Sequence, residues 1–112
     1  MSSTLGMYIL RGHEVVPEED VTTWARWLEK ANTTIACYEA DGVRVSTAFL
    51  GLDHNYRGEG PPLLFETMVF GGKHDGCQWR CSTWLEAQDQ HMMVVGKVNG
   101  LASRSARTAR RR

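Results

Sequence analysis

The sequence of 112 residues lacks the features that mark several common protein classes. No unbroken run of apolar residues is longer than four, whereas a helix that spans a bilayer needs about 20. Only three cysteines occur, and an odd number without a charged and apolar leader argues against a secreted disulfide framework. Only three prolines occur and 42% of the residues are hydrophobic, which argues against a disordered or collagen-like chain. We therefore expect one soluble globular domain with a cytoplasmic location.

The net charge is zero because 13 basic and 13 acidic residues balance, but the basic residues are unevenly placed. Five of them lie in the last nine positions: Arg104, Arg107, Arg110, Arg111 and Arg112. The rest of the chain holds eight basic and 13 acidic residues, a net charge of −5 that repels phosphate. Residues 102–112 show no apolar periodicity, so we expect a disordered tail after a single domain of residues 1–101. The tail is either a solvated extension or an arm that contacts nucleic acid or an acidic partner.

Hydrophobic periodicity and turn signals divide the domain into a strand, a helix, four strands and a final helix. The expected strands are Met7–Leu10, Thr34–Glu39, Val43–Leu50, Leu63–Phe70 and Cys77–Cys81, and the expected helices run from Pro17 to about Asn32 and from Thr83 to about Val98. The Leu63–Phe70 segment is strongly apolar, which favours a central strand covered on both faces. The order predicts an α+β fold of two layers, with two amphipathic helices packed on an antiparallel sheet of about five strands.

Local signals support the turns and the helix starts. Asp41-Gly42 is the pair best suited to a two-residue hairpin turn. Pro17 precedes three carboxylates, and Glu86 follows Thr83 by three residues, as in a capping box. The first helix has one apolar face, made of Val21, Trp24, Ala25, Leu28 and Ala31. Trp27 lies off that face, so it is interpreted either as a core residue or as a contact with a partner protein.

Residues 51–62 form the longest expected loop, with three glycines, two prolines and no periodicity. Loops of this length are usually functional or mobile. This one concentrates side chains suited to a binding surface: Asp53, His54, Asn55, Tyr56, Arg57 and Glu59. His54 with Asp53 or Glu66 could instead act as a general acid/base pair. A third interpretation is plain loop structure, in which Asp and Asn satisfy the backbone of the loop itself.

Four side chains of the types that bind zinc occur in the C-terminal half: His74, Cys77, Cys81 and His91. Their spacing is not that of a structural zinc site, and in an extended strand Cys77 and Cys81 would lie about 13 Å apart. We therefore predict buried free thiols and no metal. No P-loop, dinucleotide fingerprint or nucleophile elbow is present, so we expect no cofactor. In a meander, His54 and His74 fall at opposite ends of a strand, about 25 Å apart.

Three segments carry a resemblance to one group of proteins. They are Phe49–Asn55, Pro61–Gly72, and Ser82-Thr83-Trp84 followed by Glu86-Ala87 and His91. On these segments the chain, from about Met7 to Val98, resembles small bacteriophage and prophage-associated proteins without an established activity. The arginine-rich tail lies outside the resemblance. What the resemblance implies is a phage or prophage context.

In that context, a small acidic protein is expected to be a non-catalytic accessory protein that binds a host or viral macromolecule in the host cytoplasm. Its negative charge would complement a basic, nucleic-acid-binding surface on a partner protein. The lack of an activated nucleophile, a metal pattern or a cofactor site agrees with this expectation. Two alternatives stay open: a small enzyme that uses His54, Asp53 and Glu66, and a component of a virion or of its assembly.

Overall fold

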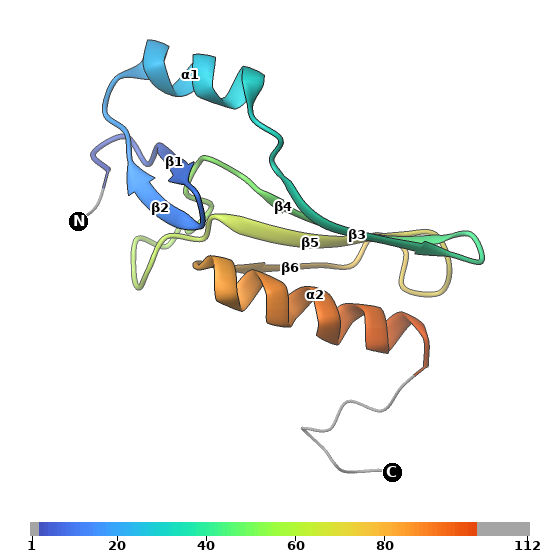
Figure 1. Cartoon of the computed structure of the whole chain (residues 1–112). Coiled ribbons are helices and arrows are strands. Elements are labelled where there is room, and N and C mark those ends of the chain that lie inside the picture. The colour runs from blue at the N-terminus through green and yellow to red at the C-terminus, as the bar shows by residue number, and fades with distance from the viewer. Residues whose placement is uncertain (1–2, 101–112) are drawn as a thin grey trace.

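The computed structural model describes residues 3–100, which form two antiparallel sheets and two helices (Figure 1). In chain order the elements are β1 (Tyr8–Arg11), β2 (Glu14–Pro17), α1 (Val21–Lys30), β3 (Thr34–Ala40), β4 (Val43–Phe49), β5 (Phe65–Phe70), β6 (Gln78–Cys81) and α2 (Trp84–Val98). The predicted α+β class is confirmed. The strands divide between a β1–β2 hairpin and a four-stranded sheet in the order β3-β4-β5-β6. Neither helix in this range is both long and apolar enough to cross a bilayer.

The four-stranded sheet is the antiparallel meander that the sequence predicts. Asp41 and Gly42 form the β3–β4 turn, and both have positive φ angles, 53° and 80°. A Cβ on Gly71 would lie 2.2 Å from the Gly42 carbonyl oxygen, so this turn touches the β5–β6 connection. The loop with His54 and the connection with His74 therefore lie at opposite ends of β5, as expected.

α2 lies along one face of this sheet (Figure 1) and begins at the predicted capping box. The backbone N–H of Glu86 donates to Thr83 Oγ1 (3.2 Å), and the backbone N–H of Thr83 donates to the Glu86 carboxylate (3.1 Å). The inward side of the helix buries Ala87, His91 and Val94. The cap therefore fixes where the helix starts, and burial fixes which face meets the sheet.

Two apolar clusters form the core, one where α2, the hairpin and the sheet meet and one between α2 and the sheet. The first lies near the start of the helix and has a buried centre of Tyr8, Phe49, Leu64, Phe65 and Ala87. The second lies nearer its end and has a buried centre of Val45, Val69 and Val94. The alternating residues of β4 and β5 thus supply one continuous inner face, as the period-2 pattern of a half-buried strand requires.

β5 is buried on one face only. Phe65, Thr67 and Val69 are fully buried, whereas Glu66 and Met68 on the other face are partly exposed. The prediction that this strand is covered on both faces is wrong, because α2 packs on one side of it. The apolar appearance of the segment comes in part from the residues before Phe65, which belong to the loop.

The hairpin and the start of the first helix differ from the prediction. Pro17 ends β2, where it pairs with Tyr8, and does not begin a helix. Proline is tolerated at a strand end, and four residues including a proline give a weak strand signal. The helix begins at Val21, because the Asp20 carboxylate accepts a hydrogen bond from the backbone N–H of Thr23 (3.0 Å). The Thr23 hydroxyl also donates to this carboxylate, and this bond together with the backbone bond lowers the pKa of Asp20. The first strand therefore belongs to a separate hairpin and not to the main sheet.

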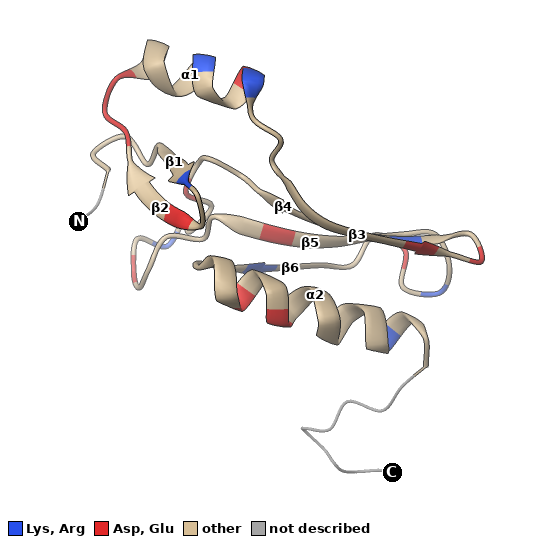
Figure 2. Ribbon diagram, viewed as in Figure 1, with Lys and Arg blue, Asp and Glu red and all other residues tan. Residues whose placement is uncertain are grey.

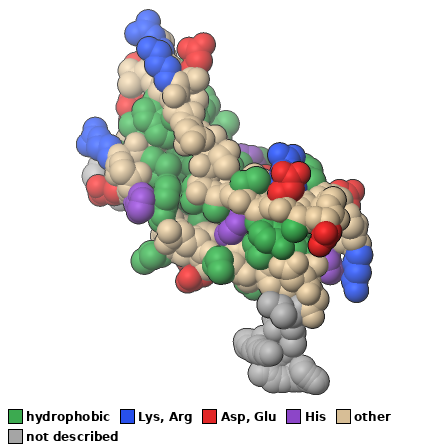
Figure 3. Space-filling view, turned by 45° about the vertical axis from the view of Figure 1, so that its right-hand side comes forward, with side chains coloured by type: hydrophobic (Ala, Val, Ile, Leu, Met, Phe, Trp, Pro, Cys, Tyr) green, Lys and Arg blue, Asp and Glu red, His purple; other side chains and the backbone are tan. Residues whose placement is uncertain are grey.

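α1 packs beside the hairpin at the end of the main sheet, so only α2 lies on the four strands (Figure 1). The indole N–H of Trp24 donates to the Gly51 carbonyl oxygen (3.1 Å). Trp27 meets Phe49 edge-on, with ring centroids 5.7 Å apart. Figure 3 shows hydrophobic side chains gathered below this helix. The two tryptophans thus define the inner face of α1.

The predicted apolar face of α1 is therefore rotated. Val21 is 54% exposed and Ala25 is also exposed, whereas Trp27 is half-buried. The prediction that Val21 and Ala25 face the core is wrong. A tryptophan buries far more apolar area than valine or alanine, so the helix turns its indoles inward.

Candidate functional site

The loop between β4 and β5 is held in shape by its own polar side chains. Asp53 Oδ1 accepts hydrogen bonds from the backbone N–H groups of Asn55 (2.8 Å) and Leu63 (2.9 Å). Asn55 Nδ2 donates to the Pro61 carbonyl oxygen (3.0 Å) and to that of Glu59. Asp53 and Asn55 therefore brace the loop backbone, as Asp and Asn commonly do in turns.

The N-terminal segment lies beside the start of this loop. Met7 and Leu52 form an antiparallel bridge, and the backbone N–H of Asp53 donates to the Gly6 carbonyl oxygen (2.9 Å). These bonds place Leu5 next to the loop. Leu5 is 57% exposed and Leu52 is 40% exposed, so each of the two neighbouring segments presents an apolar side chain to solvent.

The braces leave other loop side chains facing solvent. Tyr56 is 81% exposed, and its ring centroid lies 5.7 Å from that of His54. An open hollow of about 480 Å³ is lined by His54, Asn55, Tyr56, Arg57, Glu59 and Leu63. The outward-facing group is called the loop surface below and consists of Leu5, Leu52, His54, Tyr56, Arg57 and Glu59. Tyrosine and arginine are the types that often dominate binding energy at protein interfaces.

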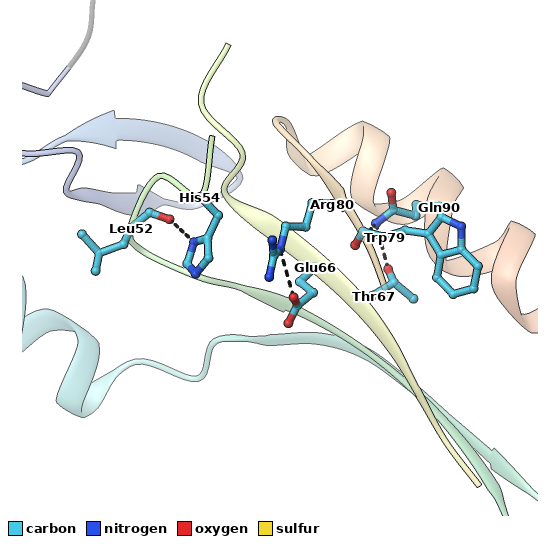
Figure 4. A network of polar contacts seen from close by, with 7 residues as sticks. All are labelled: Leu52, His54, Glu66, Thr67, Trp79, Arg80 and Gln90. Atoms are coloured by element: carbon cyan, nitrogen blue, oxygen red, sulfur yellow. Dashed lines mark hydrogen bonds and ion pairs between the residues drawn. The ribbon is translucent and has the colours of Figure 1, made fainter. Parts of the chain in front are cut away.

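The three candidate acid/base residues each bind a different group. His54 Nδ1 lies 2.8 Å from the Leu52 carbonyl oxygen, to which it donates (Figure 4). Glu66 forms an ion pair with Arg80 at 3.0 Å, and Asp53 accepts from the loop backbone. Within residues 3–100 no hydrogen bond or ion pair joins any two of the three. His54 therefore has no carboxylate partner that would orient or activate its ring.

A second polar group lies buried between α2 and the sheet. Thr47 and Thr67 are fully buried, and their hydroxyl oxygens lie 2.7 Å apart. His91 Nδ1 lies 2.8 Å from Thr47 Oγ1, and Gln90 Nε2 donates to Thr67 Oγ1 (3.1 Å; Figure 4 shows the Gln90 contact). These four residues are called the threonine–histidine chain below. They connect α2 to both central strands of the sheet.

One arrangement of hydrogens lets each hydroxyl of the threonine–histidine chain both accept and donate a bond. Gln90 donates to Thr67, Thr67 donates to Thr47, and Thr47 donates to His91 Nδ1, which carries no proton. Burial lowers the pKa of His91 because desolvation disfavours the charged ring, which agrees with a neutral histidine. A hydroxyl bonded to a neutral histidine has the geometry of an activated nucleophile. Because Thr47 is fully buried, no substrate reaches it, and the chain serves to join helix and sheet.

Trp27, which the sequence assigns either to the core or to a partner contact, packs against the first apolar cluster. Its remaining surface borders a shallow hollow with Arg26 and Lys30. Most of its contact area is therefore used inside the molecule, at the junction of α1 and the sheet.

The four zinc-type side chains lie in different surroundings. Cys77 is exposed, Cys81 packs against the first apolar cluster, His91 belongs to the threonine–histidine chain, and His74 lies in the β5–β6 connection. The prediction of buried thiols is wrong for Cys77, which is exposed; Cys37 on β3, for which no burial was predicted, is exposed as well. Burial raises the pKa of Cys81 to about 11, so this thiol stays protonated. The described part of the chain contains no group of three or more potential metal ligands.

Sequence reasoning missed Leu5 and Leu52 as members of the loop surface, since an isolated leucine in a polar segment carries no signal of its place in the fold. It also missed Thr47 and Thr67, because a threonine on a strand is usual whether or not its hydroxyl is bonded. The tail arginines Arg104, Arg107, Arg110, Arg111 and Arg112 lie outside the described residues.

Fold and site together describe a small α+β protein with a braced, outward-facing loop. No protein-family model, curated protein or solved structure matches the chain. The functional conclusion therefore rests on the geometry of the loop surface and on the charge of the chain.

Proposed function

We propose that this protein is a non-catalytic accessory protein that binds another protein through the loop surface, in the phage or prophage context that its sequence resemblance implies. The observation that carries the proposal is the contrast within one loop. Asp53 and Asn55 fix the backbone, while Tyr56 stays 81% exposed. A loop that is ordered before binding loses less conformational entropy on association.

The composition of the loop surface fits a protein partner. Leu5, Leu52 and Tyr56 supply exposed apolar groups, and Arg57 and Glu59 line the same hollow as Tyr56. Protein interfaces commonly combine apolar and aromatic anchors with a polar rim. The proposal therefore assigns anchoring to the apolar groups and orientation to the charged ones.

The charge of the chain favours a partner with a basic surface. Up to Leu101 the chain holds eight basic and 13 acidic residues. Acidic residues occur on β2, on the segment before α1, on β5 and on α2 (Figure 2). Complementary charge speeds encounter and makes binding sensitive to salt. A nucleic-acid-binding surface of a host or viral protein has the required sign.

The observed bonds support binding over the alternative of a small enzyme. A general base must reach its substrate and needs a partner that tunes it, as in catalytic dyads and triads. His54 is held by a backbone carbonyl, and Glu66 is neutralised by Arg80. Asp53 accepts from the loop backbone, so neither Asp53 nor Glu66 is placed to assist His54.

Affinity capture from a host lysate, at low and at high salt, tests the proposal. The full chain, a chain ending at Leu101 and the Tyr56→Ser variant are compared, with Leu85→Ser as the matched control. Leu85 is 71% exposed on α2 and does not belong to the loop surface. We expect one protein to be retained by the first two forms and by Leu85→Ser, released by salt, and lost with Tyr56→Ser.

Two results would overturn the proposal. Recovery of nucleic acid with the full chain alone would place the function on the tail. Equal retention of the partner by Tyr56→Ser and Leu85→Ser would remove the loop surface from the interaction.

A further inference from the structure

The two free edges of the four-stranded sheet differ in protection. β6 has four residues, and the Gln90 side chain of α2 donates to the Trp79 carbonyl oxygen of this strand (3.1 Å; Figure 4). β3 has seven residues and, within residues 3–100, pairs only with β4. No other strand runs beside it (Figure 1). β3 therefore presents a row of backbone donors and acceptors that another strand can bind.

β3 also lacks the devices that usually prevent edge pairing. Proteins place lysine, proline or inward-pointing charges on exposed edges. The strand sequence Thr-Ile-Ala-Cys-Tyr-Glu-Ala contains no proline and no basic residue, and Glu39 is its single charged residue. Its register shift lies at the start, between Thr34 and Ala36, so the rest of the strand is regular. The edge is long and nearly free of charge.

We propose that β3 is the docking edge for a second copy of this chain, which adds its own β3 in antiparallel orientation and joins the two sheets. An antiparallel pair of identical strands has a two-fold axis, so each copy uses the same surface. Cys37 is the middle residue of the strand and lies in its regular part, so an axis through it pairs Cys37 with Cys37 and Ala36 with Tyr38. The joined sheet would place the two α2 helices on the same face.

Side chains in this register are complementary. Glu39 falls at the register shift of the second copy's strand and not opposite the second copy's Glu39, so like charges do not face each other. The large Tyr38 lies opposite the small Ala36. Tyr38 faces the side of α2, since it pairs with the buried Val45 of β4. Any register centred on Glu39 would bring two carboxylates together, which disfavours it.

The proposal is independent of the loop surface, because no residue of that surface belongs to β3. Binding of a partner protein at the loop and pairing of two copies at β3 can each fail without the other. The test is therefore made on the purified full chain alone.

Sedimentation equilibrium under reducing conditions, over protein concentrations from about 1 to 200 µM, measures the association of the wild-type chain. We expect a mass that rises toward a dimer for the wild type and for Cys77→Lys, whose position is also exposed but lies outside β3. In Cys37→Lys two lysines would face each other, and we expect dimerisation to weaken at least tenfold. Circular dichroism confirms that both variants are folded.

A disulfide crosslink between two Cys37 thiols tests the same pairing without introducing a charged residue. Directly opposite residues of an antiparallel pair have Cβ atoms about 4.5–5.5 Å apart, close enough for two Cys37 thiols to form a disulfide after a small adjustment. Mild oxidation with copper–phenanthroline in air should give a disulfide-linked dimer in the wild type and in Cys77→Ser, and none in Cys37→Ser. A chain that stays monomeric at every concentration would overturn the proposal. So would a dimer that Cys37→Lys leaves intact.

Discussion

Two groups of polar side chains, each with one histidine, differ in what their hydrogen bonds connect. Around His54, Asp53 and Asn55 bond to the backbone of their own loop, at the surface. Around His91, the side chains bond to one another across the boundary between helix and sheet. The first group shapes a surface and leaves it open, whereas the second joins two layers, and its Thr47, Thr67 and His91 are buried. The presence of several polar residues in a sequence therefore does not indicate whether they shape a surface or join two layers of the fold.

The largest expected effect comes from breaking the buried group. Thr67→Val removes a hydroxyl that bonds to both Thr47 and Gln90, so the buried Thr47 hydroxyl keeps only its bond to His91 and the Gln90 amide keeps only its bond to the Trp79 carbonyl oxygen. We expect a loss of about 2 kcal/mol in the free energy of unfolding, measured by urea denaturation. Thr22→Val on the exposed side of α1 is the control and should change stability by less than about 0.5 kcal/mol. An equal loss in the free energy of unfolding in the two variants would show that the hydrogen bonds of the threonine–histidine chain do not stabilise the fold.

A smaller effect is expected from breaking the loop braces. Asp53→Ala removes the acceptor of two backbone N–H groups, which water can partly replace at the surface. We expect a loss of about 1 kcal/mol and faster hydrogen exchange at the Leu63 amide. Asp53→Asn keeps a side-chain carbonyl oxygen and should retain most of the protection. An unchanged exchange rate in Asp53→Ala would contradict the role of Asp53 as a brace.

The pH dependence of the free energy of unfolding tests the burial of His91. Burial lowers the pKa of folded His91 below its unfolded value of about 6.5, so the unfolded chain binds the extra proton first. The contribution of neutral His91 to the free energy of unfolding is complete above about pH 6.5. As the pH falls toward the folded pKa of His91, the free energy of unfolding declines by at most about 1.4 kcal/mol per pH unit. Urea denaturation between pH 5 and 8 measures this slope. His91→Gln should lack this component, and an identical profile in the variant would refute the assignment.

The smallest effect on stability is expected at the loop histidine. His54→Ala removes one exposed hydrogen bond to the Leu52 carbonyl oxygen, which water can replace. We expect a change of less than about 0.5 kcal/mol in the free energy of unfolding. The same variant should bind the captured partner less tightly, because His54 stands beside Tyr56 on the loop surface. A large loss of stability would place His54 among the structural residues.

Local chemistry made much of the fold predictable. The Asp41-Gly42 turn requires positive φ angles, and the Thr83 and Glu86 cap requires two specific side chains, so both are encoded within a few residues. The central strands follow from alternating burial. The hairpin strand β2 was not predictable in this way, because four residues ending in Pro17 carry too little signal.

The candidate site was only partly predictable. The loop and its polar residues are visible in the sequence, but which of them brace the backbone depends on distances across ten residues, such as that between Asp53 and Leu63. The rotation of α1 depends on tertiary contacts of Trp27 with Phe49 that helical periodicity does not encode. His91 was visible only as a candidate ligand, since its partner Thr47 lies 44 residues away.

Site-specific photo-crosslinking in host cells tests the central claim most directly, since it reads the contact in place. A photoreactive amino acid is introduced at Tyr56 on the loop surface or at Leu85 on α2, both strongly exposed in the structure. The account predicts one discrete protein adduct from position 56 and none from position 85. No adduct from position 56, or the same adduct from both positions, would contradict the assignment of partner binding to the loop surface.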